Sequence, residues 1–379
     1  MTFRLLVGLA MAAAVAGVSL AACSAKPLHS EASPGRRQAV AHLSEAAIMA
    51  AVTPQVTLLM ADPRYQSVSG AVVYAGRVHT FHYGLSPSGS APDDQTLYEI
   101  GSLTKTVTGL LLAQAVLEGR VELDVPVARY LPEIDPSRLG RNGKSITLRH
   151  LATHMSGLPM LLACEDQDLP TARLACLAGH DDQDFIARLA RVELQSDPGE
   201  TYLYSNAGAR LVGLILESVY GAPYPDLVRR FLLARDGRMD IRCGYAVETK
   251  TRLAVRENVA ASCDGAGGLV ASTADMGRYL ALYLDDGDPI AAQATTPLFQ
   301  DGQFGRAYFW NTYRPETEGQ LYHGGGTFNT SSWISIYPRQ GLGVFLVTPN
   351  VVEGAQGALN ERANAIADQI RLEVREPVR

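Results

Sequence analysis

The stretch IGSLTKTVTG, residues 100–109, places a lysine three residues after a serine in an otherwise uncharged segment. If Ser102 stands at the start of a helix, Lys105 projects over the same face one turn later. A serine hydroxyl is a weak nucleophile and needs an adjacent base. A lysine in an apolar setting can be that base, because burial disfavours its charged form. The helix N-terminus also favours charge on the serine oxygen. The Ser-x-x-Lys pattern therefore predicts a nucleophile, Ser102, and its base, Lys105.

Taken alone, this motif is better explained by a capping serine and a lysine that reaches solvent. Its context changes that interpretation. The stretch LYEIGSLTKTVTGLLLAQAVLEGRVELDVPVARYLPE resembles the serine β-lactamase and DD-peptidase superfamily, and specifically its class C-like branch. The resemblance continues through ITLRHLATHMSGLP, PGETYLYSNAGARLVGLILE and AGGLVASTADMGRYL, and it covers nearly the whole mature chain. It implies that Ser102 forms an acyl-enzyme.

The second motif of that family, Tyr-x-Asn, matches the YSN sequence at residues 204–206. A phenol near Ser102 could relay protons to the leaving group, and the resemblance implies this role for Tyr204. The side chain of Asn206 can donate to a substrate amide and hold Lys105 in place. An ordinary loop followed by a helix-starting asparagine is the alternative, and the preceding PGETYLY disfavours it.

The third motif of the family is Lys-Thr-Gly or His-Thr-Gly on an edge strand. Here YHGGGT offers His323, Gly324 and Gly325, followed by Gly326. Small residues let a substrate backbone lie against a strand. The resemblance implies that His323 and Gly325 contact substrate and that the N–H groups of Ser102 and Gly326 form an oxyanion hole. The chain departs from the usual family residues in having His for Lys and Gly324 for Thr or Ser.

Three competing kinds of site fit the sequence less well. The run GGGT could form a phosphate-binding loop, but no GK[ST] follows it. His150 and His154 have the spacing of metal ligands on a helix, but position 151 is leucine where a zinc protease needs glutamate. The GxSxG signature of α/β-hydrolases is absent around Ser102. We therefore expect no metal and no cofactor, with the two histidines in the core or at a helix cap.

The elements that must position these residues come from different parts of the chain. Strand-like runs, such as SVSGAVVYAGRVHTFHYG and TSSWISIYP, lie toward both ends, and helical patterns dominate the middle. This order predicts an α+β fold of the β-lactamase/DD-peptidase type. Its antiparallel sheet is built from both chain ends and flanked by terminal helices, and an all-helical domain is inserted. We expect the sheet domain at 38–101 and 250–379 and the helical domain at 102–249, within one catalytic unit at 38–375.

The first residues are not expected to belong to the fold. Residues 1–22 carry one positive charge and then a long apolar stretch, which is typical of a secretory signal peptide. The sequence Leu-Ala-Ala-Cys resembles the bacterial lipobox, so Cys23 is expected to carry lipid and residues 23–37 to form a tether. A retained transmembrane anchor or plain secretion is the alternative.

Four cysteines remain once Cys23 is assigned to lipid, and an even number in an oxidising compartment indicates disulfides. The sequence does not determine their connectivity. We predict that neighbours pair, Cys164 with Cys176 and Cys243 with Cys263. No CxxC occurs, so a zinc site of the usual spacing is not expected.

The composition is that of a soluble globular protein. The 379 residues are 47% hydrophobic, and the net charge of −6 gives no basic footprint for nucleic acid. We expect a serine hydrolase lipid-anchored in the cell envelope, acting as a DD-carboxypeptidase/endopeptidase on D-Ala-containing peptidoglycan peptides and binding penicillin. A class C-like β-lactamase, a β-lactamase-like esterase and a non-catalytic penicillin-binding sensor are the alternatives. A histidine at position 323 favours the peptidase, because a neutral imidazole attracts a β-lactam carboxylate less than lysine does. The oligomeric state stays open.

Overall fold

The computed structural model describes residues 43–86, 89–164, 176, 180–249, 252–256, 263–314, 319–349 and 352–375. The predicted signal peptide, the lipidation site Cys23 and the tether lie outside these residues. Residues Ala41–Arg379 form one unit by their internal contacts. The boundaries between a sheet domain and a helical domain therefore stay predictions. No helix of the described part is long and apolar enough to cross a membrane.

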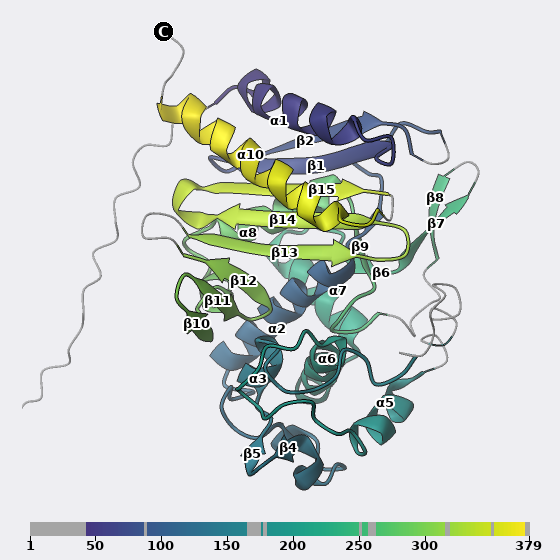
Figure 1. The fold of residues 1–379 in the computed structure, drawn as a ribbon, viewed down its shortest axis with the longest axis vertical. Coiled ribbons are helices and arrows are strands. Elements are labelled where there is room, and N and C mark those ends of the chain that lie inside the picture. The colour runs from purple at the N-terminus through teal and green to yellow at the C-terminus, as the bar shows by residue number, and fades with distance from the viewer. Residues whose placement is uncertain are drawn as a thin grey trace, which may run out of the picture. The chain divides into compact units, whose positions relative to one another are not determined.

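An eight-stranded antiparallel sheet forms the centre of this unit, in the order β10-β11-β12-β13-β14-β15-β1-β2 (Figure 1). Two strands come from the N-terminal part and six from the C-terminal part. They meet where β1 pairs with β15, with Ser69 opposite Val347. The strands are β1 (Ser67–Tyr74), β2 (Arg77–Gly84), β10 (Phe299–Asp301), β11 (Phe304–Ala307), β12 (Trp310–Tyr313), β13 (Gln320–Gly326), β14 (Ser331–Tyr337) and β15 (Leu342–Thr348).

Helices cover both faces of the sheet, and this explains why β1, β14 and β15 are buried along their whole lengths. The terminal helices α1 (Glu45–Met60) and α10 (Ala355–Arg375) lie side by side on one face. Helix α8 (Thr273–Tyr283) packs against the other face, where Leu280 contacts Gly343. The predicted antiparallel sheet from both chain ends, with flanking terminal helices, is confirmed.

The inserted region is mainly helical, as expected, and is built around α2. Eleven of the residues of α2 are buried, because α6, α7 and α9 surround it. The helices of this region and the segment after it are α2 (Thr104–Leu117), α3 (Leu148–Ala152), α5 (Asp182–Leu189), α6 (Asn206–Tyr220), α7 (Tyr224–Arg235) and α9 (Pro289–Ala294), with 3₁₀ turns η1 (Gly101–Leu103), η2 (Val127–Tyr130) and η3 (Pro136–Leu139). A further 3₁₀ turn, η5 (Pro338–Gln340), links β14 to β15.

Short strands add three small sheets to this architecture. In the sheet β3-β9-β6, strand β3 comes just before the turn η1, which contains the serine predicted as nucleophile. The short strands are β3 (Tyr98–Glu99), β4 (Gly140–Arg141), β5 (Lys144–Ser145), β6 (Arg242–Cys243), β7 (Tyr245–Thr249), β8 (Arg252–Arg256) and β9 (Leu269–Ala271).

Both predicted disulfides form: Cys164 is bonded to Cys176 and Cys243 to Cys263. The prediction that neighbouring cysteines pair is confirmed. The first bond closes a segment next to α5, and the second joins β6 to the chain just before β9.

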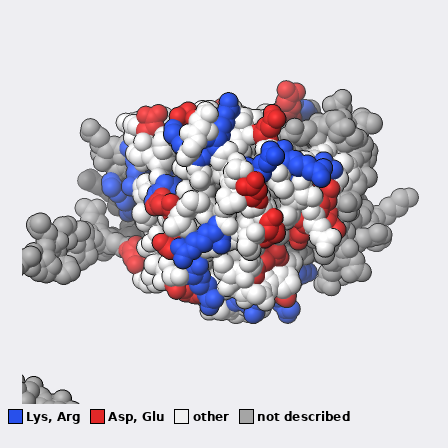
Figure 2. Space-filling view, turned by 90° about the horizontal axis from the view of Figure 1, so that it is seen from below, with Lys and Arg blue, Asp and Glu red and all other residues white. Residues whose placement is uncertain are grey.

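Surface charges of both signs are interspersed on the face shown in Figure 2. Ion pairs such as Arg149–Asp124 (2.6 Å) and Lys144–Glu200 (2.5 Å) join charges of the helical region. This mixture contrasts with the clustered Lys and Arg side chains of a nucleic-acid-binding face.

Candidate active site

Ser102 lies in the 3₁₀ turn η1, directly before α2, and Lys105 is the second residue of α2. Lys105 is completely buried, and its Nζ donates to Ser102 Oγ at 3.1 Å and to the carbonyl oxygen of Ala266 at 2.7 Å. The structure thus brings together the pair that the Ser-x-x-Lys spacing predicts. A buried amine without a carboxylate partner among the described residues is costly, which is a mark of a functional site.

Tyr204 approaches the same oxygen from the segment that leads into α6. Its hydroxyl donates to Ser102 Oγ at 2.7 Å, and Lys105 Nζ lies 5.0 Å from the centre of its ring. The segment is held in place because Ser205 caps α6, accepting a hydrogen bond from the N–H of Gly208 at 2.9 Å. Ser102 Oγ is therefore contacted by two groups that can exchange protons with it.

Asn206 occupies the first position of α6, and its N–H donates to the carbonyl oxygen of Met160 at 2.9 Å. Within the described part of the chain, its side chain makes no hydrogen bond to Lys105. The carbonyl oxygen of Ala266 takes the place that we expected the Asn206 side chain to occupy. The other expected contact of Asn206, with a substrate amide, stays a prediction.

The end of β13 lies against the nucleophile turn. A Cβ on Gly101, whose φ is +55°, would lie 2.7 Å from both N and O of Gly326, and one on Gly325 would lie 2.2 Å from the carbonyl oxygen of Ile100. Only glycine permits so close an approach of the two backbones. The N–H groups of Ser102 and Gly326 thus belong to one junction, as an oxyanion hole requires.

At the end of β13 beside Ser102, the strand edge that faces β12 is not paired with β12. Strand β12 pairs with β13 only through residues 320–322, so residues 323–326 extend beyond it. An unpaired edge presents N–H and C=O groups that can bind an extended peptide. The position of this edge beside Ser102 makes it a candidate site for a substrate backbone.

His323 is buried on β13, with 4% of its surface exposed, and its Nδ1 lies 2.7 Å from the carbonyl oxygen of Gly324. A carbonyl only accepts, so Nδ1 carries the proton. Burial, together with the charge of Lys105, lowers the pKa of His323 to about 4. The imidazole is therefore neutral at pH 7, and its Nε2 is an acceptor. Sequence alone placed this titration near pH 6.5, because it does not reveal burial.

The two histidines with metal-like spacing have other roles. Nδ1 of His150 accepts from the N–H of Thr147 at 3.3 Å and so caps α3, which ends at Ala152. His154 follows that helix in the left-handed region, with φ 57°. Its Nδ1 accepts from the N–H of Ser205 at 3.2 Å, and its ring packs 4.6 Å from that of Tyr204.

One cluster of ligand-type side chains could be mistaken for a metal site. Among the described residues, the group whose ligand atoms lie within reach of a shared ion is Cys164, Cys176 and His180. The two sulfur atoms of this group are joined in the disulfide, which removes them as thiolate ligands.

Arg306 on β11 is a site residue that the sequence analysis missed. Its guanidinium lies 4.5 Å above the ring of Tyr202, and no carboxylate of the described residues lies within ion-pair distance of it. Its Nε is buried without a hydrogen-bond partner. Burial is the main cause of the low pKa of His323, and the charges of Lys105 and Arg306 add to it. No motif spacing marks this arginine, because its place depends on the β11–β12–β13 pairing.

The comparisons with known proteins agree with this geometry. The family model for Beta-lactamase matches residues 52–369. The chain is 27% identical over 307 residues to the D-alanyl-D-alanine-carboxypeptidase/endopeptidase AmpH of Escherichia coli K12, a match that covers 73% of this chain and 77% of AmpH. It is 32% identical over 203 residues to the esterase EstB of Burkholderia gladioli, which covers 51% of each protein.

Among solved structures, the fold is similar to that of a β-lactamase/D-alanine carboxypeptidase from Yersinia pestis. The TM-score is 0.69 at 18% identity, and the match covers 86% of this chain and all of the other. The family model spans Ser102, Lys105, Tyr204 and His323, the residues that the fold gathers around one oxygen atom and one strand end. The chain belongs to the Beta-lactamase family and is a serine hydrolase of that type.

Proposed function

We propose that this hydrolase is an exported DD-carboxypeptidase/endopeptidase that cleaves D-Ala-containing peptidoglycan peptides, and that penicillin acylates the same serine. The observation that carries the proposal is the contact of Ser102 Oγ with both Lys105 Nζ, at 3.1 Å, and Tyr204 Oη, at 2.7 Å. The similarity to AmpH, a protein named for this activity, supports the choice of substrate.

Acylation follows from these contacts. In its unprotonated form, Lys105 takes the proton of Ser102, and Oγ attacks the carbonyl carbon of the scissile amide. The N–H groups of Ser102 and Gly326 hold the oxyanion. Tyr204 delivers a proton to the leaving nitrogen as the C–N bond breaks, which releases the amine product and leaves an ester on Ser102.

Deacylation reverses these roles with water as the nucleophile. A water molecule loses its proton to the Tyr204 phenolate and attacks the ester carbonyl carbon. The C–O bond to Ser102 breaks, Ser102 Oγ takes back the proton that Lys105 holds, and the peptide leaves as a carboxylic acid that ionises in water. The same two side chains therefore serve both half-reactions.

The substrate side of the site favours peptides. The edge of β13 at residues 323–326, which extends beyond β12, can pair with an extended peptide. A neutral His323 gives no fixed charge for the carboxylate of a β-lactam or of a terminal D-Ala, whereas Lys in its place would. We therefore expect slow β-lactam hydrolysis. Hydrolysis of small esters is expected as a side activity, in keeping with the similarity to EstB.

The first test is covalent labelling. A fluorescent penicillin should label the wild-type protein on the peptide that contains Ser102, and Ser102→Ala should take up no label while keeping its folded circular dichroism spectrum. Undiminished labelling of Ser102→Ala would remove the assignment of the nucleophile.

The second test compares a D-Ala-D-Ala peptide, a chromogenic cephalosporin and a short-chain nitrophenyl ester. Release of D-Ala with slow cephalosporin turnover is the expected result. Cephalosporin turnover near the diffusional ceiling of about 10⁸ M⁻¹s⁻¹, without peptide cleavage, would identify a β-lactamase. Turnover of the ester alone would identify an esterase, and a lasting penicillin adduct without any turnover would identify a sensor.

The site of action is part of the proposal. A lipid on Cys23 would hold the enzyme at the cell envelope, where peptidoglycan lies. Cys23→Ser should release the protein from membranes into the soluble fraction, because bacterial lipoproteins carry more than one acyl chain and a single chain binds only marginally. Wild-type protein that fractionates as fully soluble would contradict the lipid anchor.

A further inference from the structure

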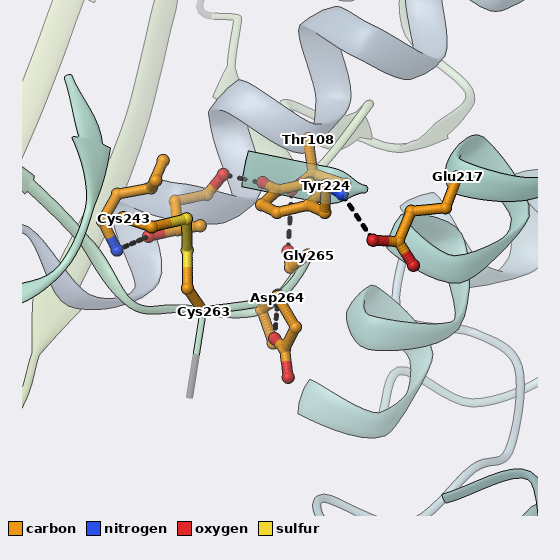
Figure 3. The surroundings of a disulfide bond; sticks show 10 residues. Thr108, Glu217, Tyr224, Cys243, Cys263, Asp264 and Gly265 are labelled. Carbon is orange, nitrogen blue, oxygen red and sulfur yellow. Dashed lines mark hydrogen bonds between the residues drawn. A yellow bond between two sulfur atoms is a disulfide. The ribbon is translucent and has the colours of Figure 1, made fainter. Parts of the chain in front are cut away.

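A short turn connects one disulfide to Lys105. Cys263, bonded to Cys243, begins the segment, and three residues later the carbonyl oxygen of Ala266 accepts the hydrogen bond of Lys105 Nζ at 2.7 Å. Figure 3 shows the bond between the two cysteines and the turn that follows it, with Asp264 and Gly265. The catalytic amine therefore depends on the placement of this backbone.

Asp264 closes the turn from within. Its Oδ1 accepts from the N–H of Ala266 at 2.8 Å, which fixes the peptide unit between Gly265 and Ala266, directly before the unit that carries the Ala266 carbonyl. The backbones of Asp264 and Gly267 also exchange two hydrogen bonds, of 3.1 and 3.2 Å. The orientation of Ala266 is thus set by one side chain and by the backbone around it.

Gly265 ties the turn to the helices on either side. Its carbonyl oxygen accepts from Thr108 Oγ1 at 2.8 Å, and Thr108 lies on α2 three residues beyond Lys105. The hydroxyl of Tyr224 lies 2.7 Å from Thr108 Oγ1, and the N–H of Tyr224 donates to Glu217 (Figure 3). A Cβ on Gly265 would lie 2.2 Å from the carbonyl oxygen of Ala209 on α6, so the turn is wedged between α2 and α6.

The geometry points to a positioning device: we propose that the Cys243–Cys263 disulfide and Asp264 hold the carbonyl of Ala266 so that it orients Lys105 as the base for Ser102. A neutral amine has two N–H groups and one lone pair. When Ala266 accepts one N–H, rotation about the Cε–Nζ bond is restricted, and the lone pair can stay directed at Ser102 Oγ. The inference rests on the proposed acyl transfer and adds to it which residues prepare the base.

Two variants of Asp264 test the hydrogen bond separately from the charge. Asp264→Ala removes the acceptor of the Ala266 N–H, and Asp264→Asn keeps an oxygen that can accept it. We expect Asp264→Ala to lower the rate constant of acylation by about 10- to 100-fold, the effect of a small misplacement in an active site. Asp264→Asn should restore most of that rate.

The pH dependence separates positioning from a loss of folded protein. In Asp264→Ala the acidic limb of acylation rate against pH should move to lower pH, because the ammonium form of Lys105 loses its fixed acceptor. The final amount of penicillin label measures the fraction of active protein independently of rate. The other titratable groups that face Lys105 in the described structure are Tyr204, His154, His323 and Asp264 itself.

The two disulfides supply a matched pair of variants. Cys243→Ser/Cys263→Ser should slow acylation by about 10-fold and move the acidic limb in the same direction. Cys164→Ser/Cys176→Ser also removes one disulfide, but its bond does not precede the Ala266 turn, so its acidic limb should stay in place.

The outcomes distinguish the two proposals. Wild-type protein that takes up no penicillin label would remove the proposed function. If penicillin labels the wild-type protein, and the acylation rate constant and the acidic limb of its pH profile are unchanged in Asp264→Ala, only the positioning role would be overturned. The same limb shift in Asp264→Asn as in Asp264→Ala would also overturn it, since charge rather than the hydrogen bond would then govern Lys105.

Discussion

Ser102 Oγ is contacted by side chains from two separate elements, whereas the strand end that faces it is left open. Lys105 Nζ and Tyr204 Oη both lie within hydrogen-bond distance of the serine oxygen, and Lys105 is fully buried. Residues 323–326 of β13, by contrast, extend past their neighbour β12 and include three glycines. We call Ser102, Lys105 and Tyr204 the nucleophile side, and residues 323–326, the proposed site for a substrate backbone, the substrate side.

This contrast explains how one family hosts several activities. The groups that move protons are held rigidly in the fold and need no help from the acyl donor. The groups that we propose to recognise the acyl donor are few: an unpaired strand edge, a neutral imidazole and one arginine. Changes on the substrate side can therefore redirect the enzyme while the nucleophile side is preserved.

Replacement of Lys105 should have the largest effect on the rate of acylation, because it removes the base and leaves the substrate side unchanged. Lys105→Met keeps most of the buried volume and removes the base, so acylation should slow by about 10²- to 10⁴-fold. The variant should be at least as stable to urea as the wild type, because methionine avoids the burial of an amine that has no carboxylate partner. Lys144→Met, at an exposed ion pair with Glu200, is the control and should acylate normally. Acylation by Lys105→Met within tenfold of wild type would contradict the base assignment.

Protonation of His323 should lower the free energy of unfolding at acid pH. The unfolded chain protonates this histidine near pH 6.5, while the folded chain does so only near pH 4, because burial and then Lys105 lower its pKa. Between these values the unfolded state binds more protons, so stability falls as the pH falls through this window. The loss should reach about 3 kcal/mol near pH 4.

His323→Gln provides the comparison for this effect, because glutamine does not titrate. Urea unfolding at pH 7 and at pH 4.5 should show a smaller acid loss for the variant than for the wild type. His154, whose pKa is lowered mainly by burial, is present in both proteins, so only the part of its shift that comes from the charge of His323 enters the difference. Parallel stability curves for the two proteins would show that folding does not lower the pKa of His323.

Gly101 lies where the turn that carries Ser102 meets the end of β13. Its replacement should show whether backbone strain or the contact with Gly326 controls the rate of acylation. Gly101→Ala places a Cβ in the left-handed region and 2.7 Å from the backbone of Gly326. The conformation costs about 1–2 kcal/mol, and the contact should push β13 away from Ser102 and slow acylation by about 10²-fold. Gly341 has a similar φ, +60°, but a Cβ added there would have no neighbouring atom within 4 Å. Gly341→Ala should therefore lose similar stability and keep its acylation rate, and equal rates in both variants would refute the contact argument.

Much of the fold was predictable because its pattern is local. The hairpin of β1 and β2, the paired β14 and β15 and the terminal helices are marked by apolar runs of the right length, and their order along the chain implies a sheet from both ends. Strands β10, β11 and β12 were not recognised. They are three or four residues long and partly exposed, so too few residues carry an alternating pattern.

The site divides in the same way. Ser102, Lys105 and Tyr204 were predicted because their motifs and the surrounding sequence resemble a known family, whereas the Ser-x-x-Lys spacing alone would not have been sufficient. The partner of Lys105 was not, since a backbone carbonyl can belong to any residue and Ala266 carries no signal of its own. The neutral state of His323 depends on its burial, and the place of Arg306 depends on the strand pairing that was missed.

Replacement of Arg306 should have the smallest effect on activity, and that effect should depend most on the substrate. It is a cation near His323 without a carboxylate partner among the described residues, and its Nε lacks a hydrogen bond. On a substrate side where the imidazole is neutral, this guanidinium can attract a free C-terminal carboxylate.

Arg306→Gln should lower kcat/KM for a D-Ala-D-Ala peptide by about 10-fold, the loss of one partly screened charge-assisted contact. The rate on a neutral nitrophenyl ester should not change, and neither should that on the C-terminal amide of the same peptide. Arg314→Gln, an exposed arginine beyond the end of β12, is the matched control and should affect none of the three substrates. An equal loss on all three in Arg306→Gln would mean that this arginine supports the nucleophile side, through Tyr202 and His154, rather than reading the charge of the substrate.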